Sequence, residues 1–190
     1  MNDIRTKGTS SVWYKGFKAS CDEVATNGSW TITDKTAKIT TTKETAAAAL
    51  AYVNALTAAT TPTTPLSWSA GLAAAGQKLY DNWDKTGTTG VTDGSNQSSV
   101  ARASNYGSLG NSPLVEAVTY ATVNFFSTQD ALTALLIGEG DSTGSTRVNL
   151  FDSKNTVASC FNGFKSNTAT DYFTEVQFAR TFTNKADINT

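Results

Sequence analysis

Two stretches in the first half of the chain repeat their apolar residues at helical spacing. An alanine-rich run follows Thr41 and Glu44, which stand at the spacing of a capping box, and it predicts a helix over 43–59. Pro62 and Pro65 then interrupt the helical pattern. A second helix is predicted to begin at Ser67 as its N-cap. Its apolar residues fall on one face and predict a core-facing stripe: Trp68, Leu72, Ala75, Leu79 and Trp83.

The second half of the chain combines one more helix with strands. Ser127 and Asp130 stand in another capping-box spacing, and the leucine-rich helix that follows is predicted to stop at Gly138. Residues 156–164 and 171–181 predict two strands joined by a turn, a terminal β-hairpin. In the second strand Tyr172, Thr174, Val176 and Phe178 fall on one face, against Phe173, Glu175 and Gln177 on the other. Helices first and an antiparallel hairpin last indicate the α+β class.

Other segments give weaker patterns. The first 40 residues carry Trp13, Tyr14, Phe17 and Trp30 without a period of 3.6 or 2, which predicts an irregular or partly helical arm that docks by its aromatic side chains. Residues 85–99 and 138–146 predict exposed loops, and a short helix is expected over 98–105. Residues 106–113 predict a glycine-rich turn. Residues 114–126 fit either a strand or a helix.

Composition then narrows the function. The chain of 190 residues contains no histidine, and so lacks the commonest general base and the commonest transition-metal ligand. A hydrolase or a zinc enzyme is therefore not expected, although composition leaves a Ser-Lys or two-carboxylate hydrolase open. The net charge is −1 and the 15 basic residues are scattered, which speaks against nucleic acid as a partner. No stretch is apolar for long enough to predict a transmembrane segment, and residues 1–11 do not form a signal peptide.

The two cysteines and two asparagines bear on the compartment. Cys21 and Cys160 are far apart in sequence, and either a single disulfide or two buried free thiols would fit them. Asn27 and Asn96 each begin an Asn-x-Ser triplet, a glycosylation acceptor if the chain is secreted. The disulfide, with abundant Thr and Ser and few charges, indicates an extracellular or cell-surface protein. An intracellular or ciliary location is the alternative, because no signal peptide is present.

Several short segments follow one another along the chain in a characteristic order. The first half contains Leu66-Ser67-Trp68, Gly71-Leu72-Ala73-Ala74-Ala75, Thr92-Asp93-Gly94-Ser95, Arg102 and Asn105-Tyr106-Gly107. The second half contains Glu116 within Val115–Tyr120, the helix end Leu135–Gly140, the segment Gly144–Phe151 and the last strand Val176–Ala179. In this order the segments resemble the CAP superfamily (cysteine-rich secretory, antigen 5 and pathogenesis-related 1), in particular the divergent SCP-like domains of protists. The resemblance covers about residues 45–181.

The resemblance implies an α-β-α sandwich with a small antiparallel sheet between helical layers. We therefore expect an amino-terminal arm over 1–42 that docks on the core, a CAP-like domain over 43–182 and a polar tail over 183–190. In many members a cleft holds two histidines and two acidic residues and binds a divalent metal. Here Leu79 stands where one histidine is expected, and Thr146, or alternatively Ser145, stands where the other is; Glu116 is the acidic member that can be placed. The resemblance thus implies a degenerate cleft without metal or cofactor.

Each remaining cleft position has two interpretations. Glu116 could bind a ligand as a relic of the cleft or accept hydrogen bonds from backbone amides. Arg147 could grip an anion or pack on the fold beside an acid. Asn149 is expected to satisfy backbone groups in the turn before Leu150. Gly138, Gly140 and Gly144 have the wrong spacing for a nucleotide loop, and Asp81, Asp84 and Asp93 lack that of an EF-hand.

Two functions follow from the resemblance. The first is a non-catalytic structural or protein-interaction module, extracellular or part of a surface or ciliary assembly, whose partners are other proteins or further copies of the chain. The alternative is a secreted carrier of a small hydrophobic ligand such as a sterol or a fatty acid. Aromatic residues could line its groove, although such residues more often belong to the core: Trp68, Trp83, Phe125 and Phe126.

Overall fold

The computed structural model describes residues 1–31, 38–40, 43–55, 62, 64–121, 128–137, 144–168 and 171–188. Helices and strands both contribute to the fold, which confirms the α+β class. The chain forms two compact units, one of residues 1–65 and 125–153 and one of residues 66–124 and 154–190. The predicted arm over 1–42 therefore lies in the same unit as the helix that follows it.

The first unit is mainly helical. Its elements are α1 (Asn2–Lys7), the short 3₁₀ helix η1 (Gly8–Ser10), α2 (Val12–Asn27), β1 (Ser29–Thr31), β2 (Lys38–Thr40), α3 (Lys43–Ala55), α6 (Thr128–Ile137) and α7 (Ser145–Phe151). The helix α2 packs against α3, β1 and α6, and α6 packs against α3 and α7. The core of this unit contains buried apolar residues from most of these elements: Ile4, Phe17, Val24, Trp30, Ala49, Val53, Leu132 and Leu136.

The amino-terminal segment is more regular than its sequence predicts. The hydroxyl of Ser11 accepts a hydrogen bond from the Trp13 amide and caps α2, which ends at Gly28 in the left-handed conformation. The guanidinium of Arg5 is completely buried and donates to the backbone carbonyls of Leu150, Asp152 and Thr64. A buried arginine that binds three carbonyls fixes α1 to the end of α7 within this unit.

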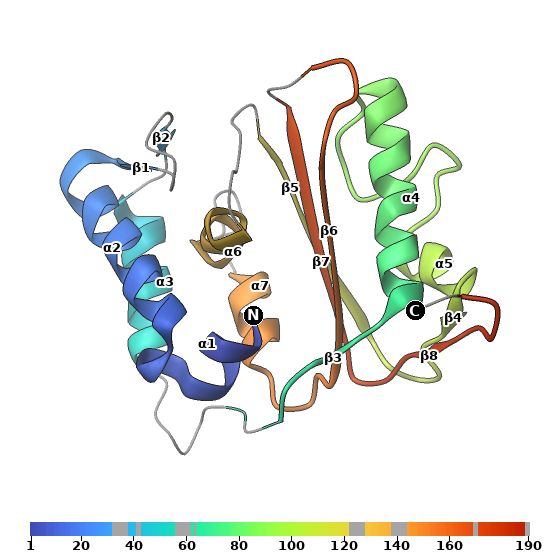
Figure 1. Cartoon of the computed structure of the whole chain (residues 1–190), viewed down its shortest axis with the longest axis horizontal. Helices are drawn as coiled ribbons and strands as arrows, with labels where there is room; N and C mark the ends of the chain where they lie inside the picture. The colour runs from blue at the N-terminus through green and yellow to red at the C-terminus, as the bar shows by residue number, and fades with distance from the viewer. Residues whose placement is uncertain are drawn as a thin grey trace. The chain divides into compact units, whose positions relative to one another are not determined.

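The second unit combines a four-stranded sheet with α4 (Ala70–Thr86). The strands lie in the order β3 (Ser67–Trp68), β6 (Val157–Phe164), β7 (Tyr172–Ala179) and β5 (Leu114–Ala121). The strand β3 is parallel to β6, and the other pairs are antiparallel. The helix α4 packs against β6 and β7 and lies along one face of the sheet (Figure 1).

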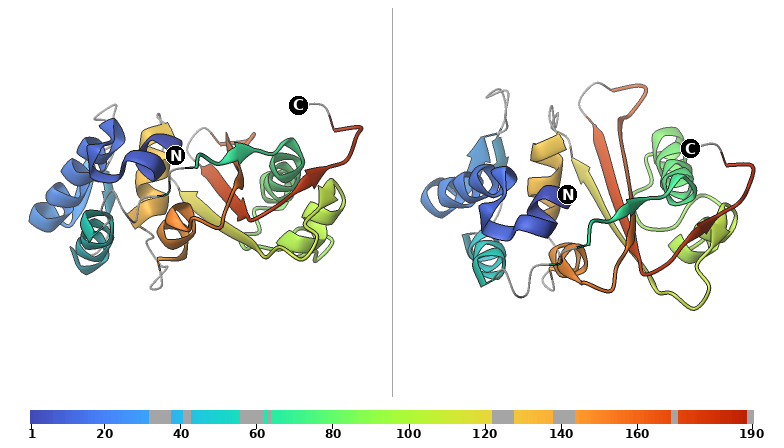
Figure 2. Two further views of the ribbon diagram at one scale, coloured as in Figure 1. Left: turned by 90° about the horizontal axis from the view of Figure 1, so that it is seen from below. Right: turned by 60° about the horizontal axis from the view of Figure 1, so that its bottom comes forward.

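The remaining elements of this unit lie near the amino-terminal end of α4 (Figure 2). They are α5 (Ser99–Ser104), β4 (Gly107–Ser108) and β8 (Thr183–Asn184), and β4 pairs with β8. The side chain of Asn184 accepts hydrogen bonds from the Gly71 amide at 3.1 Å and the Ser69 hydroxyl at 2.8 Å. Part of the predicted polar tail is therefore a strand that holds the start of α4.

The sheet agrees with most of the predicted strands. The terminal hairpin forms with Phe164 opposite Tyr172 and Val157 opposite Ala179, and the ambiguous segment 114–126 is a strand as far as Ala121. Residues 122–126 of this segment lie outside the described residues. Both faces of β7 are buried. Helix α4 provides one helical layer on this sheet, and the second layer of the predicted sandwich stays a prediction.

Two helix predictions need correction. The cap of α4 is Ser69 rather than Ser67, because Ser67 and Trp68 pair with β6 as the strand β3. Trp68 is consequently 60% exposed instead of lying on the core stripe, whereas the other four members of that stripe are buried. The helix α7 occupies a segment whose beginning was predicted as a loop. The predicted caps Thr41, Ser127 and Gly138 lie outside the described residues.

Candidate functional site

Four polar side chains meet in the interior of the second unit, between α4 and the sheet. Glu116 lies on β5 directly opposite Gln177 of β7, and Glu175 lies two residues before Gln177. Because side chains alternate along a strand, these three point toward the same face of the sheet. Arg102 reaches them from α5. We call these four residues the buried polar cluster.

The centre of the buried polar cluster is an ion pair. The Arg102 Nη2 group donates to Oε1 of Glu116, and the two side chains are 0% and 3% exposed. The other terminal nitrogen, Nη1, donates to the carbonyls of Val91 at 2.7 Å and Gln97 at 2.9 Å. The pair thus ties the loop before α5 to the sheet.

A second carboxyl group adjoins the pair. The Gln177 Nε2 amide donates to Oε1 of Glu116 at 2.9 Å and to Oε1 of Glu175 at 2.6 Å. One amide nitrogen therefore holds both carboxyl groups. Burial is the main cause that raises the pKa of Glu175 well above its usual value, and the neighbouring Glu116, within hydrogen-bonding reach, adds to the shift.

Helix α4 leaves room for Glu175 only because it carries glycine at the point of contact. A Cβ atom on Gly76 would overlap the Oε2 atom of Glu175. The carboxyl group therefore rests directly on the helix backbone. A larger residue at position 76 would force either the helix or the carboxyl group to move.

Apolar clusters close both sides of the buried polar cluster. On one side Leu72 and Ala75 of α4 pack with Ala103, Leu109 and Ala179. On the other side Leu79 and Trp83 pack with Phe173, and aromatic rings surround Phe173 at centroid distances of 5.4 to 6.4 Å: Tyr80, Trp83, Tyr120 and Phe161. The carboxyl pair is consequently a closed part of the core and offers no open cleft to a substrate.

The predicted cleft residues of this unit have internal partners. Leu79 is 1% exposed and belongs to the aromatic cluster. Glu116 pairs with Arg102, which corrects the expectation that it accepts bonds from backbone amides. Arg102 was noted in the sequence only as part of the family resemblance.

Sequence reasoning missed Glu175 and Gln177 as members of a site. The signal that could have found them is their position on β7 between Phe173 and Ala179, which occupy the same face. Polar residues between apolar ones on one strand face are predicted to be buried and to need partners.

The other predicted cleft residues lie on α7 of the first unit. Arg147 is buried and donates to the carbonyls of Leu136 at 3.1 Å and Ile137 at 2.9 Å, so that it caps the end of α6. Thr146 is buried. The Asn149 side chain donates to the carbonyl of Ser145 at 2.8 Å, a backbone group one turn earlier in α7 and not in the predicted turn before Leu150.

A glycine makes the position of Arg147 possible. Gly144, the residue before α7, has a φ of +60°, and a Cβ atom there would overlap the Arg147 guanidinium. The sequence Gly-Ser-Thr-Arg therefore encodes a helix start and an internal cap. Neither expectation for Arg147, an anion grip or a pairing with an acid, describes these backbone contacts.

Cys21 and Cys160 are free thiols in the structure and belong to different units, so the predicted disulfide between them stays a prediction. Cys21 is buried on α2, where burial raises the pKa of its thiol to about 12, and burial raises the pKa of Cys160 as well. Both thiols are therefore protonated and poorly reactive at neutral pH. Asn27 and Asn96 are exposed, and their glycosylation stays a prediction.

Trp68 and Trp83, the two residues of the expected ligand groove that the structure describes, do not lie together. Trp83 is in the core cluster at the carboxyl-terminal part of α4, whereas Trp68 precedes the helix. The intervening helix separates them by roughly 20 Å at 1.5 Å per residue. Phe125 and Phe126 lie outside the described residues.

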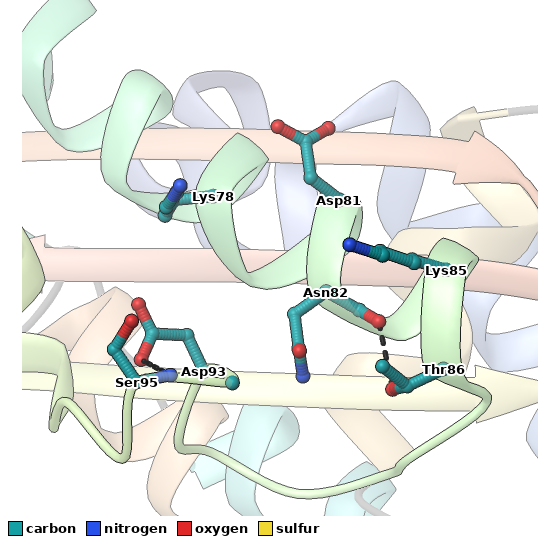
Figure 3. A pocket seen from close by; sticks show the side chains of 8 residues that line it. Lys78, Asp81, Asn82, Lys85, Thr86, Asp93 and Ser95 are labelled. Carbon is teal, nitrogen blue, oxygen red and sulfur yellow. Dashed lines mark hydrogen bonds between the residues drawn. The ribbon is translucent and has the colours of Figure 1, made fainter.

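A polar pocket of about 390 Å³ lies on the outer side of α4 (Figure 3). Its wall combines helix residues with the loop before α5: Lys78, Asp81, Asn82, Lys85, Thr86, Asp93, Gly94 and Ser95. The carboxylate of Asp93 accepts hydrogen bonds from the amides of Ser95 at 3.0 Å and Gln97 at 2.9 Å, so it organises the loop. Lys78 and Lys85 are exposed, and Asp81 also lines the pocket, so that its wall carries both positive and negative charges.

Two general findings complete the description. In the described ranges no three histidine, cysteine, aspartate or glutamate side chains are grouped as metal ligands would be. Of the helices the structure describes, none combines the length and apolar character that crossing a membrane requires.

Comparisons of the chain with protein-family models, with curated proteins and with solved structures give no match.

Proposed function

We propose that this protein is a non-catalytic structural or protein-interaction module. The observation that carries the proposal is the closed state of the buried polar cluster: its carboxyl groups bind Arg102 and Gln177 and lie against α4. Catalysis on a substrate needs such groups within hydrogen-bonding reach of the substrate. Because this cluster is internal, we expect the protein to act through its surface.

Within the described residues, the edge strand β3 offers a contact element on the surface. Trp68 on this strand is 60% exposed, and exposed tryptophan is enriched in protein interfaces. The Ser67 amide donates to the carbonyl of Thr156, just before β6, and the Ser69 amide to that of Ala158 on β6, so the alternation of a strand directs the Trp68 amide away from the sheet. An exposed strand edge with a large aromatic residue suits contact with another protein.

The family and the compartment belong to the same proposal. A CAP-like module is supported by the order of the motifs along residues 45–181. An extracellular or surface location is supported by the low charge density and the abundant Thr and Ser. The free thiols remove the disulfide as a further support.

Native mass spectrometry of the purified protein separates this function from its competitors in one spectrum. We expect the mass of the chain and its oligomers without a bound lipid or divalent metal. A stoichiometric lipid would establish the carrier instead, and a stoichiometric metal would establish a functional cleft.

The contact surface is tested with a matched pair of variants. Trp68→Ala removes the exposed ring of β3, and Val148→Ala removes an exposed apolar side chain elsewhere. We expect oligomers, or proteins cross-linked to the chain in its native source, to disappear with Trp68→Ala and to persist with Val148→Ala. Equal binding by both variants and the wild type would contradict a role for β3.

A further inference from the structure

The buried polar cluster holds more acid than base. Its two carboxyl groups, those of Glu116 and Glu175, face a single cation, the guanidinium of Arg102. Glu175 is completely buried, as are Arg102 and Gln177. An uncompensated buried charge is strongly unfavourable, and a buried carboxylate without its own cation becomes neutral by binding a proton.

The hydrogen bonds of the cluster show where that proton belongs. The Oε1 atoms of both glutamates accept from Gln177, and Glu116 also accepts from Arg102. The Oε2 atoms of Glu116 and Glu175 are both buried, and no donor from the described residues serves either of them. A proton on one carboxyl group would donate to the other, because the two groups lie within hydrogen-bonding reach.

The packing leaves no room for a larger ligand beside Glu175. Its Oε2 atom rests on the backbone of α4 at Gly76, where even a methyl group would overlap it. A metal ion would need several oxygen ligands around it and would also face the Arg102 guanidinium. The proton is the ligand that both the space and the charge admit.

We propose that Glu116 and Glu175 share one proton, and that its loss as the pH rises loosens α4 from the sheet. Once the proton has left, a second negative charge is buried against the backbone of α4. The repulsion between the two carboxylates and the cost of burial both favour an opened unit in which Glu175 reaches water. The second unit thus contains a pH-sensitive contact between α4 and the sheet. This inference does not depend on the proposed function.

Other titratable groups lie near Glu175, and their charge states affect its titration. They are Arg102 of α5, Glu116 and Tyr120 of β5 and Cys160 of β6. On α4, Tyr80 lies one helical turn after Gly76, the residue that Glu175 contacts. Burial raises the pKa of both tyrosines and of the cysteine, so these groups stay neutral in the neutral range. The raised pKa of Glu175 makes it the group of the buried polar cluster whose charge change the proposal invokes.

The direction of the pH effect follows from the raised pKa of Glu175. The folded pair binds its proton more tightly than the unfolded chain, so stability is fully present at acidic pH. It is lost as the pH rises through the folded pKa. Between the unfolded and the folded pKa, the unfolding constant increases by up to about tenfold per pH unit.

The test measures the proton directly and then its consequence. In ¹³C NMR of the wild-type protein at pH 7, we expect the Glu116–Glu175 pair to carry one protonated carboxyl group. Glu175→Gln, which mimics the neutral form, should remove that signal and, in urea titrations, abolish the increase in the unfolding constant that begins above the pKa of an ordinary glutamate, about 4.3. Asp81→Asn, an exposed acid on the outer side of α4, is the matched control and should retain the wild-type pH dependence.

Two results would overturn the proposal. The first is a wild-type spectrum in which both carboxyl groups are ionised at pH 7, a measurement that does not depend on how any variant folds. The second is a Glu175→Gln variant that folds and keeps the pH dependence of the wild type.

Discussion

Replacement of Arg102 by methionine is the sharpest perturbation of the buried polar cluster. Methionine keeps much of the apolar length of arginine but removes the cation that Glu116 faces and the two hydrogen bonds to Val91 and Gln97. Without a cation the pair of glutamates must bind a second proton to remain buried. The variant therefore folds with one more bound proton than the wild type.

The size of the effect follows from that proton. An ordinary glutamate has a pKa of about 4.3, so keeping it protonated at pH 7 costs about 3.7 kcal/mol, at 1.36 kcal/mol per unit. The lost hydrogen bonds add about 1 kcal/mol each. We expect Arg102→Met to lower the free energy of unfolding by about 4 to 6 kcal/mol at pH 7, a large share of the typical 5–15 kcal/mol. At pH 5 the loss should fall to about 2 to 3 kcal/mol, because protonation there costs only about 1 kcal/mol.

Urea unfolding followed by near-UV circular dichroism at pH 5, 6 and 7 measures this difference. Arg180→Met, which removes an exposed arginine beyond the end of β7, is the matched control and should change stability by less than about 0.5 kcal/mol at every pH. A loss that does not depend on pH, or one below about 1 kcal/mol at pH 7, would refute the reasoning, since Arg102 would then not be the counter-ion of a buried carboxylate.

Three further changes test other parts of the structure. Leu79→Ala should lower the free energy of unfolding by about 2 to 5 kcal/mol in urea titrations, because it leaves a cavity beside Trp83 and Phe173. A negligible change would mean that Leu79 faces solvent. Arg147→Met should weaken the hydrogen-exchange protection of α6, because the Leu136 and Ile137 carbonyls lose their donors at a cost of about 1 to 3 kcal/mol. Unchanged protection would exclude Arg147 as the cap of α6. Alkylation without reductant should modify both Cys21 and Cys160 in the unfolded chain. In the folded chain it should spare Cys21, whose thiol is buried with a pKa of about 12. An intact mass lower by two hydrogens would instead reveal a disulfide.

The sequence predicted those elements whose period agrees with their surroundings. The helix around Leu72, Leu79 and Trp83 and the hairpin of β6 and β7 repeat their apolar residues clearly, so the local pattern determined them. Trp68 was misassigned because it fits the helical stripe by spacing. Its pairing with β6, which is 89 or more residues away in sequence, is a tertiary contact that no local pattern contains.

The buried polar cluster could be predicted only in part. Glu116 was identified from a resemblance, but its partner Arg102 is 14 residues earlier and Gln177 is 61 residues later. Only the register of β5 on β7 places Glu116 opposite Gln177, and that register depends on the whole sheet. The role of Gly76 was equally hidden, because a glycine in a helix shows its purpose only once the facing side chain is known.

Carboxyl footprinting of the native protein tests most directly whether Glu116 and Glu175 lie in a closed core. In this measurement a carbodiimide and an amine modify accessible carboxyl groups, and mass spectrometry locates them. We predict rapid modification of the exposed Asp81 and none of Glu116 and Glu175 until urea unfolds the chain. Modification of Glu116 in the folded protein at the rate of Asp81 would contradict the structure and would restore an open cleft as the functional site.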